Sequence, residues 1–239
     1  MEQRDALLTV QQATAKKGLS FRGLVKVFYM PSAFFAELKD HPKILIPYMV
    51  IAVLLFCFFA ITADIIYNMQ VSSPQFQELM RRAGMTPQME RSMRYQILIG
   101  GPIVRLLAPL IAAVLGMFWG NFVFAGKTRF KQLLSVMLYG EIIYRLGMIA
   151  VLPLVLAKKS MLVSLSLGVL AASQGQGSIL YLALSKIDLF LIWEIIAIGI
   201  GLSITYGVPR NKGYRLSVLS MGMLSILHVV FSAVGKLIF

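Results

Sequence analysis

Charged residues are scarce in this sequence, and that scarcity excludes an ordinary soluble domain. Only 14% of the 239 residues are charged, whereas 58% are hydrophobic and the mean hydropathy is +0.78. A soluble domain of this length needs a polar shell, which this composition does not supply. The apolar residues also fall in long blocks rather than in alternation, so the sequence predicts membrane helices and not a β-barrel.

Cysteine and histidine are almost absent, which excludes several kinds of site. The single cysteine, Cys57, allows no intramolecular disulfide. Its apolar neighbours favour a buried, inert thiol over a nucleophile, because such surroundings disfavour the thiolate. The two histidines, His41 and His228, belong to no metal-ligand cluster. Catalytic signatures and nucleic-acid-binding motifs are missing too, so we expect no enzyme activity, no cofactor, no metal and no nucleic-acid partner.

The long apolar blocks predict an all-α, polytopic membrane protein with five transmembrane helices. The expected spans are 44–67, 103–124, 133–157, 187–208 and 216–238. Residues 161–172 are also apolar, but about 12 residues rise only about 18 Å in a helix, against a hydrocarbon core of roughly 30 Å. This segment is therefore interpreted as non-spanning, either interfacial or re-entrant.

The chain divides into a basic N-terminal arm, 1–42, and a transmembrane domain, 43–239. Within the arm, Pro31 fits the first turn of a helix. Phe34, Phe35 and Leu38 then share one face, opposite charged residues. Two interpretations stand equally: an interfacial helix lying on the cytoplasmic leaflet, or a helix packed under the membrane bundle.

The polar residues 72–99 contain the signals of two short helices. Ser73 followed by Pro74 predicts the start of the first, and Gly84 its end. Thr86 followed by Pro87 predicts the start of the second. We therefore expect a helical hairpin between the first two spans.

The basic residues set the expected orientation. The net charge of +13 would suggest a nucleic-acid partner in a soluble protein, but lysine and arginine gather in cytoplasmic loops beside anionic lipid. With the N-terminus inside, the larger share of the basic residues is cytoplasmic: Arg4, Lys16, Lys17, Arg22, Lys26, Lys39, Lys43, Lys127, Arg129, Lys131, Arg210, Lys212 and Arg215. The expected location is the bacterial cytoplasmic (inner) membrane.

Four charged residues inside the expected spans are the candidate functional residues, because charge in hydrocarbon is costly. They are Glu141, Arg145, Asp188 and Glu194. Glu141 and Arg145 are four apart and can pair on one helix face. A structural ion pair is preferred over a polar pathway or a partner-recognition patch. Glu194 is the exception, because it has no partner nearby in the sequence, although Arg145 could reach it from a neighbouring helix.

Small residues recur every four positions in two of the expected spans. They place a narrow groove along one helix face, where another helix can approach closely. The residues are Ala112, Gly116, Gly120, Gly199, Ser203 and Gly207. Packing within the chain is preferred over dimerisation, and a homo-oligomer remains the alternative.

Three stretches, in order, carry a resemblance to a known family. They are MPSAFFAELKDHP (30–42), FVFAGKTRFKQLLSVMLYGEIIYRL (122–146) and IDLFLIWEIIAIGIGLSITYGVPRNKGY (187–214). Over roughly 25–235 the chain resembles the Yip-one domain family of polytopic membrane proteins, in its bacterial branch. Relatives often carry paired glycines where this chain has Ala125 and Gly126.

The resemblance implies five helices, a cytoplasmic N-terminus and no enzyme activity. It suggests a non-enzymatic membrane adaptor or assembly factor that binds another membrane complex, such as the subunits of an ABC-type exporter. The alternative is a small-molecule or lipid transporter that uses the four intramembrane charged residues. An intramembrane enzyme is the least favoured hypothesis.

Overall fold

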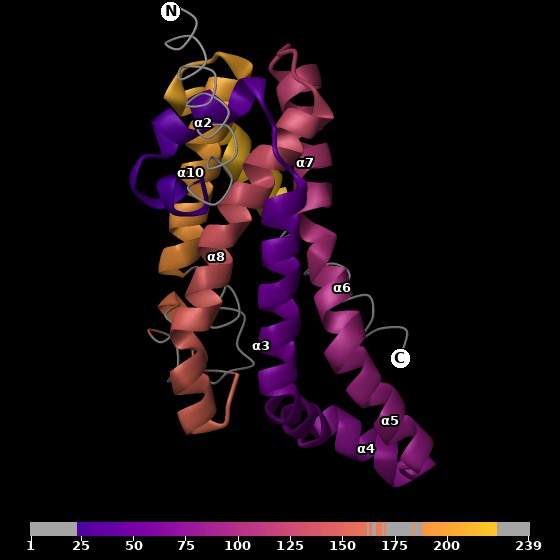
Figure 1. The fold of residues 1–239 in the computed structure, drawn as a ribbon. Coiled ribbons are helices and arrows are strands. Elements are labelled where there is room, and N and C mark those ends of the chain that lie inside the picture. Colours follow the sequence, from indigo (N-terminus) through magenta and orange to yellow (C-terminus); the bar gives the residue numbers. More distant parts are fainter. Residues whose placement is uncertain are drawn as a thin grey trace, which may run out of the picture.

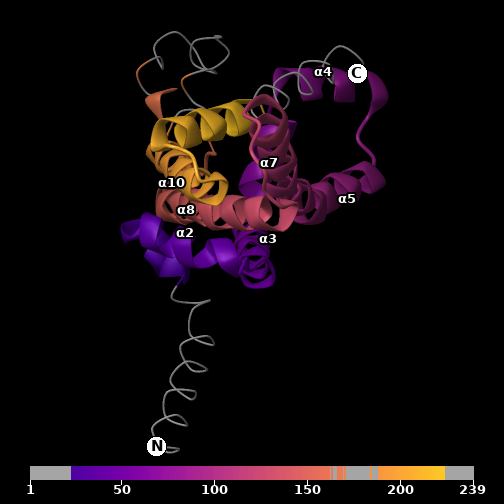
Figure 2. The same cartoon turned by 90° about the horizontal axis from the view of Figure 1, so that it is seen from above.

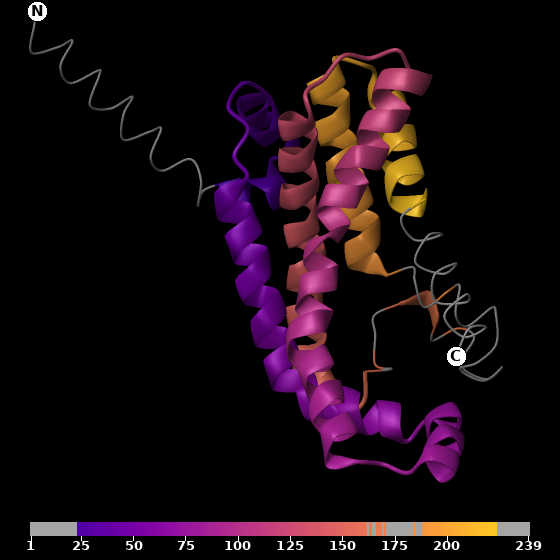
Figure 3. The ribbon, with the colours of Figure 1, turned by 90° about the vertical axis from the view of Figure 1, so that its right-hand side faces the viewer.

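The computed structural model describes residues 23–161, 163, 166–168, 170, 184 and 188–223, and within these the fold is helical. Among the described residues, four helices are long and apolar enough to cross a membrane: Leu45–Val71, Pro87–Val123, Phe130–Lys158 and Leu189–Tyr206. They run side by side (Figures 1 and 3). The first four expected spans are thus found. The fifth, 216–238, is described only to residue 223, as part of a helix over 210–223.

Helix α8 (Phe130–Lys158) is the centre of the bundle. It contacts α3 (Leu45–Val71) and α2 (Pro31–Asp40) on one side, and α7 (Ala108–Met117) and α10 (Leu189–Tyr206) on the other (Figure 2). Its first half is buried almost without interruption from Leu133 to Ile143. A helix that is apolar all round and buried all round is the element to which the others dock.

Helix α2 packs on the bundle, against α10 and α8. Phe34, Phe35 and Leu38 are the face that it buries. The ring of Phe34 packs edge-on against Tyr139 of α8, with 4.6 Å between centroids. The structure thus shows the apolar face of this segment packed on the bundle. Residues 1–22 of the arm lie outside the described residues.

A helical hairpin projects from the opposite end of the bundle (Figures 1 and 3). It consists of α4 (Pro74–Ala83) and α5 (Pro87–Tyr95). Both bounds of α4 and the start of α5 are those that the sequence predicts. The Ser73 hydroxyl accepts a hydrogen bond from the Phe76 N–H at 3.3 Å, and that of Thr86 accepts one from Met89 N–H at 3.2 Å. These side chains satisfy N–H groups that the first helical turn leaves unpaired.

The second long helix is not a regular α-helix throughout. Two π-helical segments, η1 (Gln96–Gly100) and η2 (Phe118–Val123), flank α6 (Gly101–Leu106) and α7. Each π turn shifts the faces that follow, and such turns often occur at functional sites. Neither segment was predicted from the sequence.

Small residues on α7 and η2 allow other helices to approach closely. Ala112 is 2% exposed. A Cβ atom on Gly116 would lie 3.0 Å from the end of Met137, and one on Gly120 would overlap the ring of Tyr206. The Tyr206 hydroxyl, in turn, donates to the Gly116 carbonyl at 3.2 Å. The contacts on this face are made within the chain.

The small residues at 199, 203 and 207 have different roles: Gly199 allows a close helix crossing, while Ser203 and Gly207 lie at or near the end of α10. A Cβ atom on Gly199 would lie 3.1 Å from the backbone of Tyr214, so this glycine lies at a close helix crossing. The hydroxyl of Ser203 donates to the carbonyl of Val208 at 2.9 Å. Gly207 has open space around it and a φ of 66°, so it ends the helix in the left-handed conformation that glycine adopts most easily.

Cys57 was expected to be buried, and that expectation is wrong. The thiol is exposed on α3. Exposed apolar neighbours such as Val53 and Phe56 show that this face of α3 is directed at lipid. The sequence established an apolar setting but not which side of the helix faces the protein. The segment 161–172 is described only at 161, 163, 166–168 and 170, so its expected non-spanning character is not tested.

Candidate intramembrane site

Glu141 and Arg145 form a buried ion pair on α8. Their side chains are 7% and 5% exposed, and the Nη2 of Arg145 donates to the Glu141 Oε1. The guanidinium also contacts the sulfur of Met148 at 3.1 Å and lies 5.5 Å from the ring centroid of Tyr144. Its Nε is buried without a hydrogen-bond partner among the described residues. A buried, unsatisfied donor is costly, so Arg145 retains unused binding capacity.

Asp188 and Glu194 bring two further carboxyl groups to this pair from α10. Asp188 caps the helix, since its Oδ1 accepts a hydrogen bond from the Leu191 N–H at 2.7 Å. Glu194 is 1% exposed, and its Oε1 has no hydrogen-bond partner in the described part of the chain. Its charged neighbours are Glu141, Arg145 and Asp188.

The structure therefore brings together the four charged residues that the sequence singled out. Spacing within α8 predicted the Glu141–Arg145 pair. No sequence signal placed Glu194 beside Glu141, because that contact is between two helices. The cluster has a buried side, formed by Glu141 and Glu194, and an accessible side, on which Arg145 and Asp188 line a cavity.

The cavity has a volume of about 740 Å3. It lies in the half of the bundle toward α4 (Figure 1). Its lining residues in α3 fall between Phe58 and Gln70, and those in α8 between Tyr144 and Val155, which are the halves of both helices that run toward the hairpin. Its wall is largely apolar, being formed by Phe58, Phe59, Ile66, Met69, Ile97, Met148, Val151, Val155, Met161, Val163 and Phe190. Gln70, Ser73 and Gln96 add polar groups toward the hairpin.

Arg105 on α6 is a site residue that the sequence interpretation missed. Its guanidinium lines the cavity and lies 4.8 Å from the ring centroid of Phe59. The charged group that acts on it is Arg145, and it forms no ion pair with any acidic residue in the described part of the chain. Because Arg105 falls inside the expected span 103–124, its position alone marked it as an intramembrane charge.

The arrangement is suited to binding an anion rather than a metal ion. Two guanidinium groups share one largely apolar cavity, and one of them has no carboxylate partner. Across the described residues, no three His, Cys, Asp or Glu side chains gather in a way that could hold a metal ion.

Comparison with known proteins identifies the family. The family model of the Yip1 domain matches residues 25–233. No curated protein and no solved structure matches the chain. The matched region covers all four membrane-spanning helices and every residue of the site. The chain is therefore a multi-pass membrane protein that belongs to the Yip1 domain family.

Proposed function

We propose that this protein is a non-enzymatic membrane adaptor that docks on another membrane protein through the α4–α5 hairpin. The observation that carries the proposal is that the chain folds this hairpin without burying it. Among the described side chains of α4 and α5, none is buried, and Leu79 and Tyr95 are 53% and 64% exposed. Exposed apolar side chains on a hairpin rich in arginine and glutamate favour contact with a protein partner.

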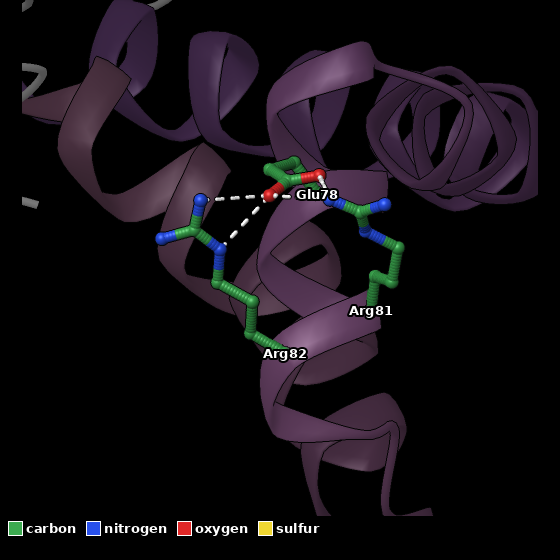
Figure 4. Close-up of polar contacts among 3 residues, drawn as sticks. All are labelled: Glu78, Arg81 and Arg82. Carbon is green, nitrogen blue, oxygen red and sulfur yellow. Dashed lines mark hydrogen bonds and ion pairs between the residues drawn. The ribbon is translucent and has the colours of Figure 1, made fainter.

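Ion pairs hold the hairpin in a defined shape. Glu78 bridges Arg81 and Arg82, each at 2.8 Å, from adjacent turns of α4 (Figure 4). Arg94 of α5 bonds Asp64 of α3 at 2.8 Å and so ties the hairpin to the first span. Solvent screens such exposed pairs, so each contributes little by itself. Together with the two N-caps they support a preformed surface, for which binding costs less conformational entropy.

The proposal includes an orientation and a class of partner. The bacterial cytoplasmic membrane, a fifth span over 216–238 and a cytoplasmic N-terminus agree with the distribution of basic residues. With the N-terminus inside, the hairpin lies on the opposite face of the membrane. An ABC-type exporter is the proposed partner, and the hairpin would then meet its permease subunit rather than its ATPase.

Site-specific photocrosslinking in intact cells tests the adaptor function. A photoreactive amino acid at Leu79 or at Met85, which is 43% exposed, is expected to yield one protein adduct of discrete mass, containing a permease subunit. The matched control is Val53, which is 57% exposed on the lipid-facing side of α3 and is expected to label lipid alone. Lipid adducts alone at Leu79 and Met85 would contradict docking through the hairpin.

A second candidate function, the handling of a small molecule or lipid, is favoured by the cavity that Arg105, Arg145 and Asp188 line. It differs from docking because it needs the interior of the bundle rather than its hairpin. Purified protein in sealed vesicles is expected to accelerate the movement of a fluorescent fatty acid across the bilayer. A rate equal to that of empty vesicles would exclude transport of that fatty acid.

A further inference from the structure

We infer that the cavity toward α4 is a binding site for a single-chain anionic lipid, whose carboxylate or phosphate is held by Arg105 and Arg145 and whose acyl chain lies along the apolar wall. This site goes beyond the adaptor function and does not depend on it. It also needs no transport, because a lipid can bind without crossing the membrane.

The charge of the cavity selects an anion. Three acidic residues lie near Arg145. Glu141 is bonded to its Nη2, Asp188 is engaged with the start of α10, and Glu194 lies on the buried side of the cluster and does not line the cavity. Arg105 has no carboxylate partner in the described residues, and its charged neighbour is the second guanidinium. Two like charges in an apolar cavity repel, and an anion bound by both removes that repulsion.

Arg145 can offer the ligand hydrogen-bond donors as well as a positive charge. It is 4% exposed overall, yet it lines the cavity, and its Nε–H is a buried donor without an acceptor in the described part of the chain. Nη1 meets only the sulfur of Met148, which is a weak acceptor. A carboxylate or phosphate oxygen bound in the cavity is a stronger acceptor than that sulfur, and guanidinium geometry suits both groups.

The apolar wall selects a chain rather than a free inorganic anion. Phe58, Met69, Val151 and Phe190 contribute to this wall, and the volume of about 740 Å3 lies in the range of roughly 300–1,000 Å3 that is usual for small-molecule sites. A polar anion alone would leave most of this surface without a partner. A lipid with one chain brings both an anion and an apolar tail, and the surrounding membrane is a source of such molecules.

The depth of Arg145 in the bundle agrees with a lipid ligand. Arg145 lies 13 residues before the end of α8 at Lys158, or about 20 Å along the helix axis. Between the level of Arg145 and that of Lys158 the cavity lining is largely apolar. The polar residues Gln70, Ser73 and Gln96 lie toward the hairpin. An acyl chain needs an apolar path of this kind.

Photolabelling with a diazirine-bearing palmitate tests the site. The full chain is embedded in phosphatidylcholine nanodiscs, labelled, digested and analysed by mass spectrometry. We expect adducts on the stretches 58–73 and 144–155, which palmitate suppresses and its neutral methyl ester does not. Lysophosphatidate serves as a second competitor, and the stronger of the two competitors identifies the head group. Equal competition by methyl palmitate, or adducts spread over the outer face of α3, would overturn the inference.

Arg105→Gln is the decisive variant. Arg105 is exposed and has no ion-pair partner among the described residues, so its loss leaves no buried carboxylate unpaired. We expect labelling to fall about tenfold, as is typical for the loss of one charge-assisted contact. Arg105→Lys is expected to retain part of the labelling, and Arg82→Gln, whose side chain is 77% exposed on the hairpin, to retain all of it.

Val151→Trp provides an independent variant, because it fills the cavity without changing its charge. Labelling is expected to disappear while the thermal unfolding midpoint stays close to that of the unsubstituted protein. Unchanged labelling in both Arg105→Gln and Val151→Trp would show that the lipid binds elsewhere.

Discussion

The two halves of the helix bundle are stabilised in different ways. Toward α2, helices approach backbone to backbone, and side chains of α8 bond carbonyl groups of α2 and of the loop that follows it. Gln132 donates to the Lys39 carbonyl at 2.9 Å, and Ser135 to that of Lys43 at 2.8 Å. Toward α4, the helices diverge around a cavity, and an ion pair with an unsatisfied donor lies at its inner end. One half specifies the fold, and this leaves the other free to carry a ligand site.

The largest expected effect on stability comes from removing the charge of Arg145, at the inner end of the cavity. Arg145→Met leaves Glu141 buried without its ion-pair partner and beside the carboxyl group of Glu194. We expect a loss of about 3–5 kcal/mol in the free energy of unfolding, measured in mixed detergent micelles with increasing dodecyl sulfate.

The control for Arg145→Met is the double variant Glu141→Gln and Arg145→Met. It removes both charges of the pair, so most of the lost stability should return. If the single and double variants unfold alike, the pair has no structural role, and the cavity half is held by apolar packing alone.

In the half of the bundle toward α2, stability is expected to depend on side-chain volume rather than on charge. A Cβ atom on Gly213 would lie 2.9 Å from the backbone nitrogen of Ser203 and 2.6 Å from its Cβ, and neither atom can move independently of α10. Gly213→Ala should therefore cost about 2–3 kcal/mol of stability in the same detergent titration.

Gly222→Ala is the matched control, since a Cβ atom there meets nothing within 4 Å. Helix propensity predicts a gain of about 0.5–1 kcal/mol for this variant. A loss at Gly222 as large as the loss at Gly213 would show that the close crossing with α10 is not the cause.

The sequence predicts what is local and misses what is made between helices. Hydropathy locates the four described spans, and Ser73 and Thr86 mark the hairpin helices, because each signal acts within one helical turn. The pair of Glu141 and Arg145 follows from their spacing on α8. By contrast, the contact of Glu194 with Glu141 depends on how helices cross, and periodicity within one helix does not encode that.

Arg105 lies on α6, which follows the π-helical segment η1, and it lines the cavity. A π turn shifts the faces of the residues after it relative to a regular α-helix, so one helical wheel for the whole span does not place this residue. Its occurrence inside an apolar span was readable from the sequence, whereas its proximity to Arg145 was not.

Asp188 has two roles in the half of the bundle that holds the cavity: it caps α10, and it lines the cavity. Asp188→Ala removes the acceptor of the Leu191 N–H and should cost about 1 kcal/mol. Asp188→Asn keeps an acceptor of similar capping strength and removes the charge, so its unfolding should be nearly unchanged. If Asp188→Asn is as destabilised as Asp188→Ala, the charge of Asp188, and not its cap, supports this end of the helix.

The smallest expected effect on stability is at Ala125, in the half of the bundle toward α2. Ala125, in the loop before α8, has a φ of 52°, in the left-handed region that costs a non-glycine residue about 1–2 kcal/mol. Glycine relieves that strain but gives the unfolded chain more freedom, worth about 0.4–1 kcal/mol. Ala125→Gly should therefore raise stability by about 0.5 kcal/mol, seen as a small upward shift of the thermal midpoint. A lower midpoint would mean that the methyl group of Ala125 packs usefully in this loop, and that the α2 half tolerates backbone strain in exchange for contact.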